Sequence, residues 1–261
     1  MENSEAFRSL HVPGKPLVLV NAWDAASARI AEWAGSRAVA TTSAGVAWSL
    51  GAPDGDALGR DDAVALVGRV VGAVSVPVSA DIESGGRTPD DVAATVRAVV
   101  AAGAAGVNLE DGHRSVEEQC ARLAAAREAA GPGLFINARL DAYLRGRGDV
   151  AEVVSRAEAF LAAGADGIFV PGVVDPAIVG QLATKIPAPL NVLAGAASAP
   201  GVAELASLGV ARVSLGSVVA EAAYAVVRRA AEEALTTGTY AAVADALDYG
   251  WLNDLMTRRT A

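Results

Sequence analysis

Carboxylate side chains recur directly after short apolar runs in this chain. Asp81 and Glu83 follow one run, and Glu110 ends the next. Asp54 lies in a loop after an earlier run. Acids that meet at close range repel one another unless protons or a cation intervene. Oxygen ligands without a His or Cys set suit Mg²⁺ or Mn²⁺ better than soft metals, so these acids indicate such a site. The alternative is that they cap helices or form ion pairs.

Eight short β-like runs carry these residues. They are rich in Val, Leu and Ile and nearly continuous in apolarity, which is typical of parallel strands buried on both faces. Most lie about 25–35 residues apart, the length of one strand–helix unit. The runs are 17–20, 38–42, 76–80, 106–110, 134–138, 167–171, 189–193 and 211–215.

Helix signals fill the intervals between the runs. Thr88 is a candidate N-cap, and Pro89 follows it at the first helical position. Ser115 and Glu118 have the spacing of a capping box. For Asp24, which precedes an apolar helical pattern, N-capping is the better interpretation. The chain therefore alternates strands with helices over most of its length.

This alternation predicts an α/β fold, a (β/α)8 TIM-type barrel, with residues 1–261 as a single domain. An open doubly wound sheet is the alternative, but its Gly-rich turn is missing after the first strand. In a barrel the site lies at the carboxyl ends of the strands, where the acids are found. The C-terminal segment, 217–261, is longer than one helix needs. We expect it to form two or three helices, over 217–236, 239–247 and 250–258.

Composition excludes several classes of protein. The 261 residues carry a formal charge of −9, which argues against nucleic acid as a partner. One cysteine, Cys120, excludes a disulfide framework and a zinc ribbon. Neither lysine, Lys15 or Lys185, lies at a carboxyl strand end, so Schiff-base chemistry is excluded. We see no signal peptide and no membrane span, and expect a cytoplasmic protein.

Five motifs in order resemble the isocitrate lyase/phosphoenolpyruvate mutase superfamily over about residues 8–235. The likeness implies a barrel whose last helix is exchanged between subunits of a homo-oligomer, such as a dimer of dimers. It also implies Mg²⁺-dependent cleavage or formation of a C–C or P–C bond beside a 2-oxo acid. The motifs are Asn21–Ala31, Thr42–Gly45 with Leu50, Gly51 and Asp54, then Ala80–Glu83, Val107–Asp111 and Ile136–Asp141.

The resemblance also implies roles for single residues. Asp81 would bind Mg²⁺ directly, and the waters of the ion would be held by Asp54, Glu83 and Glu110. Arg139 would contact the substrate carboxylate or the enolate oxygen that develops during the reaction. We predict Arg139, Asp54 and Glu110 as catalytic residues. For substrate binding we predict Thr42, Ser43, Ala44, Arg139, Asn191 and His113.

The chain departs from the family at the loop after Glu110. The lyases place a catalytic Cys in this loop, and the mutases place a Lys and an Asn there. Here the residues are Asp111-Gly112-His113-Arg114, and a helix begins immediately afterwards. A histidine that the mutases carry after strand 6 is also absent, with Phe169-Val170-Pro171 in its place. These differences argue against isocitrate cleavage and phosphonopyruvate formation.

The residues and the resemblance together predict a lyase that depends on Mg²⁺ or Mn²⁺, acts on a small 2-oxo acid and is similar to oxaloacetate decarboxylase. Loss of CO₂ leaves a pyruvate-type enolate and needs no acid for the leaving group. The alternatives are a phosphonopyruvate hydrolase or mutase type of P–C bond enzyme, another activity such as aldol-type condensation, and a non-catalytic 2-oxo acid binding protein. The sequence does not name the substrate.

Overall fold

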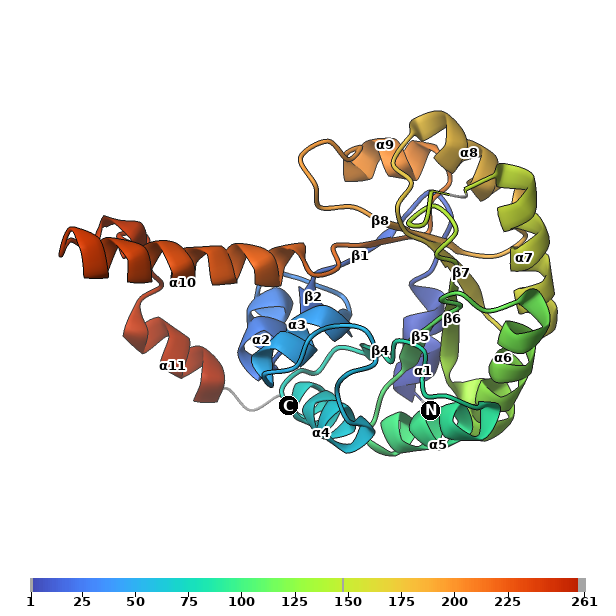
Figure 1. Cartoon of the computed structure of the whole chain (residues 1–261), viewed down its shortest axis with the longest axis horizontal. Helices are drawn as coiled ribbons and strands as arrows, with labels where there is room; N and C mark the ends of the chain where they lie inside the picture. The colour runs from blue at the N-terminus through green and yellow to red at the C-terminus, as the bar shows by residue number, and fades with distance from the viewer. Residues whose placement is uncertain (1, 147, 258–261) are drawn as a thin grey trace.

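One parallel sheet forms the centre of the molecule (Figure 1). The structure is a computed structural model that describes residues 2–146 and 148–257. The strand order runs from β1 through β9, β8, β7, β6, β5, β4 and β3 to β2, and neighbouring strands of this sheet are parallel. Because β1 and β2 adjoin in sequence, the sheet curls into a nearly closed barrel. This confirms the TIM-type fold.

All eight predicted runs contain strands, and a further strand, β2, follows directly after the first run. The break falls at Val20, where the chain stops pairing with β9 on one side and starts pairing with β3 on the other. The strands are β1 (Leu17–Leu19), β2 (Asn21–Ala22), β3 (Val39–Thr41), β4 (Val78–Asp81), β5 (Gly106–Glu110), β6 (Phe135–Arg139), β7 (Gly167–Val170), β8 (Leu190–Leu193) and β9 (Arg212–Ser214).

Helices surround this barrel and cover its outer face (Figure 1). Capping boxes open α2 at Asp24, α5 at Thr88 and α6 at Ser115, as the sequence predicts. The helices are α1 (Glu2–Ser9), α2 (Ala25–Trp33), α3 (Ser43–Ser49), α4 (Arg60–Val71), α5 (Pro89–Ala101), α6 (Val116–Ala130), α7 (Val150–Ala162), α8 (Pro176–Lys185), α9 (Val202–Ser207), α10 (Val218–Thr236) and α11 (Tyr249–Thr257).

The Asn21 side chain joins the two ends of the sheet. Its Oδ1 accepts from the backbone N–H groups of Leu215 (3.0 Å) and Gly216 (2.9 Å). Its Nδ2 donates to the Thr41 carbonyl (3.1 Å). These three bonds replace part of the ladder that is interrupted between β1 and β2, so one buried amide closes the barrel.

Helix α1 covers the amino-terminal end of the barrel. Phe7 is fully buried and packs edge-on against Phe135, the first residue of β6. His11 stacks on the same Phe135 ring at 4.1 Å and is also buried. A Cβ at Gly106 would collide with the Phe7 ring, so glycine is required at the start of β5. Apolar packing thus fills one end of the barrel and leaves the other for polar groups.

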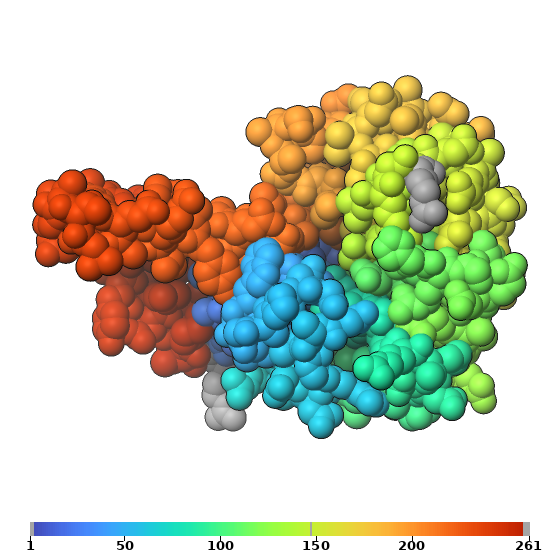
Figure 2. Space-filling model, in the orientation of Figure 1, coloured from blue at the N-terminus to red at the C-terminus, as the bar shows by residue number. Residues whose placement is uncertain are grey.

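The C-terminal helices extend away from the barrel as an arm, 218–257 (Figures 1 and 2). Helix α10 projects outward, and α11 turns back to pack on α2, with Trp251 edge-on to Trp33 at 5.0 Å. The predicted helices over 217–236 and 250–258 are largely confirmed, although 258 lies outside the described residues. The predicted helix over 239–247 is wrong. Only a 3₁₀ turn, Ala241–Val243, forms there, and the Glu233 carboxylate accepts the backbone N–H groups of Ala241 and Ala242.

No helix within residues 2–146 and 148–257 is both long enough and apolar enough to cross a membrane.

Candidate active site

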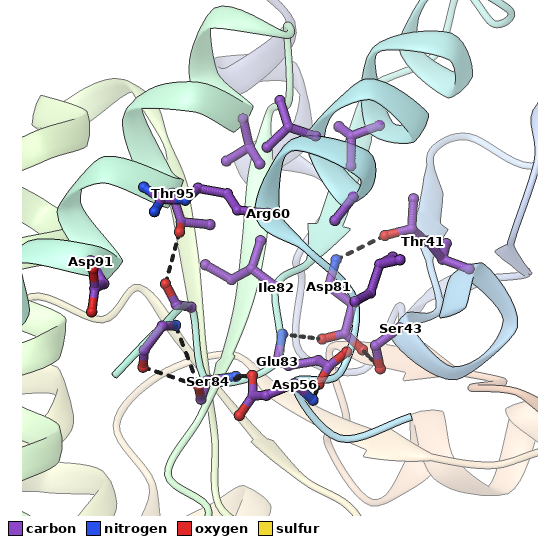
Figure 3. A pocket seen from close by; sticks show the side chains of 18 of the residues that line it. Thr41, Ser43, Asp56, Arg60, Asp81, Ile82, Glu83, Ser84, Asp91 and Thr95 are labelled. Carbon is purple, nitrogen blue, oxygen red and sulfur yellow. Dashed lines mark hydrogen bonds between the residues drawn. The ribbon is translucent and has the colours of Figure 1, made fainter. Parts of the chain in front are cut away.

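Asp81 is the last residue of β4 and stands at the carboxyl end of the barrel (Figure 3). Its backbone N–H donates to Thr41 Oγ1 (2.9 Å), which ties it to the neighbouring strand. Its Oδ2 accepts from Ser43 Oγ (3.3 Å), and its Oδ1 accepts from the Glu83 backbone N–H (3.2 Å). The carboxylate is therefore held by Ser43 of α3 and by the loop after β4, and the Asp81 backbone is held by Thr41 of β3.

Glu83 and Asp56 bring two loops together next to Asp81. The Asp56 backbone N–H donates to Glu83 Oε2, and Asp56 Oδ1 accepts from Ser84 Oγ (2.9 Å). Glu83 and Asp56 both have positive φ angles, 51° and 61°, which non-glycine residues adopt at a cost. This backbone strain is stored beside the acid cluster, where such conformations concentrate.

Arg122 fixes the loop that follows Glu83. It reaches from α6 and donates to the backbone carbonyls of Ser84, Gly86 and Arg87. The side chain is buried, so these neutral carbonyls take the place of its water. Gly86 has a φ of 130° and lies against α5, which leaves no room for a Cβ. The loop is thus shaped by backbone contacts and one buried arginine.

Arg139, Glu110 and Asp141 form a second cluster at the same end of the barrel. Arg139 Nη1 lies 3.0 Å from Glu110 Oε2, and its Nε donates to Asp141 Oδ1 at 2.7 Å. Glu110 and Arg139 are paired residues in the β5–β6 register. Asp111, next in the chain, pairs with Arg156 at 2.8 Å instead. Asp111 and Asp141 therefore each form ion pairs with arginines.

Burial shifts the acid–base behaviour of this site. It raises the pKa of Glu83 to about 7, and the nearby acids Asp56 and Asp54 add to the effect. It also raises the pKa of Glu110 to about 7, against the opposing charge of Arg139. The pKa of the Asp81 carboxyl is raised by burial as well. Protons therefore compete with any cation for these oxygens near neutral pH.

A buried arginine lies in the barrel interior below these acids. Arg212, on β9, is fully buried and donates to Asn108 Oδ1 (3.2 Å) and Ser214 Oγ (3.3 Å). Burial lowers its pKa to about 9, and the charge of Asp81 opposes that shift. Ser214 Oγ in turn donates to Asn191 Oδ1 (3.2 Å). The interior beneath the site is thus polar, and the guanidinium of Arg212 interacts electrostatically with Asp81.

The structure brings some predicted residues together and leaves others apart. Asp54 is exposed in the loop after α3, where its charge acts on Asp81 and Glu83. Thr42 and Ala44 are buried at the start of α3. The Thr42 backbone N–H donates to the Ala22 carbonyl at 3.0 Å. The side chains of Ser43, Asp81 and Glu83 converge.

Asn191 and His113 occupy opposite environments. Asn191 is buried on β8, and its Nδ2 has no hydrogen-bond partner within the described part of the chain. His113 is exposed in the short loop between β5 and α6. Within residues 2–146 and 148–257, neither side chain forms a hydrogen bond or an ion pair with Ser43, Asp81 or Glu83.

The donor set at Asp81 fits a hard divalent cation held mainly through water. Within the described residues, no three His, Cys, Asp or Glu side chains are already arranged as ligands. Mg²⁺ usually keeps several waters and takes one or two carboxylates, so it does not require such a cage. Asp81 offers one carboxylate, which the Ser43 hydroxyl and the Glu83 backbone N–H contact, and the Glu83 carboxylate lines the same pocket. Burial raises the pKa of Asp81, Glu83 and Glu110, even though the charge of Arg139 opposes the shift at Asp81 and Glu110, so a further cation would find carboxylates whose ionised form it can stabilise.

A pocket of about 380 Å³ adjoins the Asp81 cluster (Figure 3). Thr41, Ser43, Asp81 and Glu83 line one side of it. The remainder lies between α4, α5 and the loops that carry Asp56 and Ser84 to Arg87.

Comparison with known proteins identifies the family. The family model for phosphoenolpyruvate phosphomutase matches residues 7–235, most of the chain. The chain belongs to the phosphoenolpyruvate phosphomutase family. This confirms the resemblance to the isocitrate lyase/phosphoenolpyruvate mutase superfamily.

Members of this family with different activities are similar to the chain. An uncharacterised protein of Mycobacterium tuberculosis is 41% identical over 221 residues, covering 82% of each chain. The 2-methylisocitrate lyase of Escherichia coli is 34% identical over 208 residues, covering 70% of each. Phosphonopyruvate hydrolase, solved as a complex with oxalate and Mg²⁺, is 26% identical with a TM-score of 0.86. That match covers 98% of this chain and 95% of the hydrolase chain.

Sequence reasoning missed three residues that shape the site. Asp56 lies two positions after Asp54 in the same loop, and this closeness to a predicted site residue could have marked it as a second candidate. Arg122 and Arg212 lie within an ordinary helix and an ordinary strand, and nothing in their sequence surroundings marks them. Only their burial and their carbonyl and amide partners reveal them.

Proposed function

We propose that this protein is a Mg²⁺-dependent lyase that acts on a small 2-oxo acid by decarboxylation or C–C cleavage. The observation that carries the proposal is the convergence of Asp81, Ser43 and Glu83 at one strand end. The Arg139–Glu110 pair at the same end of the barrel supports it. Family membership and a 34% identical lyase also support it.

Each residue then has a separate role. Asp81 would hold the cation directly, and Asp54, Glu83 and Glu110 would hold its waters. When bound, Mg²⁺ supplies positive charge to an oxygen that becomes anionic as the bond to C3 breaks. Arg139 would add a guanidinium beside that oxygen and stabilise the transition state more than the ground state.

Other groups would orient the substrate. The hydroxyl of Ser43 and the first turn of α3, with Thr42 and Ala44, would hold its carboxylate. Asn191 would donate through the Nδ2 that is unpaired in the described chain, and His113 would contact the substrate at the rim. These assignments rest on position in the family motifs and on the geometry above.

The short loop after β5 favours decarboxylation. Ser115 caps α6 five residues after Glu110, which leaves only Asp111 to Arg114 between strand and helix. Such a loop offers no cysteine or lysine as an acid for a leaving group. Departing CO₂ needs no such acid.

A P–C bond reaction is the second candidate. The observation in its favour is the similarity to phosphonopyruvate hydrolase over nearly the whole chain. The products distinguish the two candidates, because a P–C bond reaction on phosphonopyruvate would release phosphate and decarboxylation would release CO₂.

We also propose that the protein is a homo-oligomer in which the arm packs on a second copy. Helix α10 buries only Ala220 fully, although apolar side chains line it. Exposed apolar surface on this scale marks an association site. A dimer of dimers is the arrangement that the family resemblance implies.

The test is a panel of 2-oxo acids with Mg²⁺ or Mn²⁺, in which pyruvate, CO₂ and phosphate are followed separately. Chelation should abolish turnover. Asp81→Asn should lower kcat/KM at least a hundredfold and weaken Mn²⁺ binding, with an unchanged circular dichroism spectrum. Glu158→Gln, on the outer helix α7, serves as the control and should behave like the native chain. Turnover that survives both chelation and Asp81→Asn would refute the proposal.

A further inference from the structure

The pocket beside Asp81 changes character along its depth. Its acid and hydroxyl side, next to Asp81 and Ser43, belongs to the candidate active site. Away from Asp81 the lining is mostly apolar and comes from α3, α4, α5 and the loops that carry Leu58 and Ile82, with Thr95 and Arg60 nearby (Figure 3). The apolar lining consists of Val46, Leu58, Ala63, Val64, Val67, Ile82 and Val99.

The polar groups near this apolar part are already occupied or face solvent. Thr95 Oγ1 donates to the Gly85 carbonyl at 2.8 Å. Arg60 and Arg87 are exposed at the solvent side. The apolar interior therefore offers a water molecule few partners, and an apolar group would be a better occupant.

The size of the pocket exceeds what a three-carbon acid needs. At about 30 Å³ for each water, 380 Å³ corresponds to roughly a dozen water molecules. A 2-oxo acid head at Asp81 and Ser43 would fill only the polar side. The rest has the volume and lining of a site for a hydrocarbon chain.

We propose that the apolar part of this pocket receives an alkyl substituent on C3 of the substrate, so that the substrate class is 2-oxo acids that carry a hydrocarbon chain. This inference rests on the proposed function, because it places the acid head at Asp81. The chain points from there toward α4, between Val64 and Ile82.

The expected signature is a gain in affinity with chain length. Burying one methylene from water is worth about fourfold in a dissociation constant. Pyruvate, 2-oxobutanoate, 2-oxopentanoate and 2-oxohexanoate differ by one methylene each and cannot be decarboxylated by loss of a C4 carboxylate. Their binding to the native chain with Mg²⁺ is measured by calorimetry. We expect about fourfold tighter binding per methylene.

Two variants of α4 locate the chain. Ala63→Phe fills the pocket, because Ala63 lines it. Ala65→Phe makes the same change two residues away, at an exposed position of the same helix that does not line it. We expect Ala63→Phe to bind pyruvate like the native chain and to lose the gain with chain length. Ala65→Phe should retain the gain, and thermal unfolding should show both variants folded.

Each outcome decides a separate point. If pyruvate binds but longer acids bind no tighter, the inference is wrong and the proposed function stands. If the gain persists in Ala63→Phe, the chain lies elsewhere and the inference is again wrong. If no 2-oxo acid binds with Mg²⁺ to the native chain, the proposed function fails and the inference fails with it.

Discussion

Glu83 and Glu110 stand near Asp81 in surroundings that oppose their ionisation. Burial raises the pKa of each glutamate to about 7, so each is about half protonated at pH 7 without a cation. A divalent cation requires the ionised form, and its binding displaces protons. We expect Mg²⁺ binding to release on the order of one proton at pH 7, more at pH 6, and almost none above pH 9. Affinity for Mg²⁺ should fall as the pH falls.

Calorimetry in buffers of different ionisation enthalpy measures this proton release. Glu83→Gln should reduce the release at pH 7 by about half. Glu128→Gln, on α6, should leave it unchanged. Proton release that does not vary between pH 6 and pH 9 would show that the glutamates stay ionised without the cation.

At the residue level, the sequence located the acids but not their partners. Asp81 and Glu83 are predictable because a strand end in a parallel barrel faces the site. The ion pair of Arg139 with Glu110 follows from the β5–β6 register, which a single sequence does not contain. The three carbonyl contacts of Arg122 cross from α6 to a loop 35–38 residues earlier, and no local pattern encodes them.

Among the elements, the junction of β1 and β2 depends on one side chain. Asn21 makes three hydrogen bonds there, at 2.9–3.1 Å, and is buried. Asn21→Ala removes the side-chain partner of the Gly216 N–H and the Thr41 carbonyl and leaves the Leu215 N–H with the Leu19 carbonyl alone, so we expect a loss of about 3 kcal/mol in the free energy of unfolding. Urea denaturation measures it.

Asn253 provides the matched control for this prediction. It donates to the Tyr249 carbonyl on the exposed helix α11. Asn253→Ala should change the free energy of unfolding by less than about 0.5 kcal/mol. Equal losses in the two variants would mean that Asn21 does not hold the barrel closed.

Helix α1 and the turn after it should make stability depend on pH. Burial lowers the pKa of His11 to about 3, below the value of 6.5 expected in the unfolded chain. Between these values the unfolded chain binds a proton that the folded chain excludes, so stability falls as the pH falls. From pH 7.5 to pH 5.0 the native chain should lose about 2 kcal/mol more than His11→Phe, which keeps a ring against Phe135.

Urea denaturation at the two pH values measures this difference. The exposed His113 supplies the control, and His113→Phe should lose as much stability as the native chain. If His11→Phe and the native chain lose equal amounts, His11 is protonated in the folded protein as well.

The elements themselves were the most predictable part of the fold. Buried strands and capped helices leave local patterns, such as Thr88 before Pro89, and the structure contains them. The helix predicted over 239–247 is reduced to a 3₁₀ turn, and the contact of Glu233 on the preceding helix with Ala241 and Ala242 is not encoded in the local pattern. The break at Val20 was not predicted, since an apolar run gives no sign of a change of partner strand.

Across the whole molecule, the arm is the part that lacks a covering surface. Helix α10 has 19 residues and is about 28 Å long. Val227 is 63% exposed and Leu235 is 86% exposed. Leu235→Glu would place a charge in the contact with a second copy, so we expect it to raise the dissociation constant of the oligomer at least tenfold, measured by sedimentation. Val100→Glu, on the outer face of α5, should leave it unchanged.

If the native chain sediments as a monomer, the arm does not join copies of this protein.

The hydrogen bonds of Asn21 also bear on when the barrel can fold during its synthesis. Its partner Leu215 is 194 residues later in the chain, and within residues 2–146 and 148–257 the one strand that pairs with β1 is β9, which immediately precedes Leu215. While the chain emerges from the ribosome, β1 therefore has no neighbour until nearly the whole barrel has been made. A chain that stops before β9 would retain two unpaired parallel edges, which favour aggregation over folding. The last strand thus determines when the first can become native.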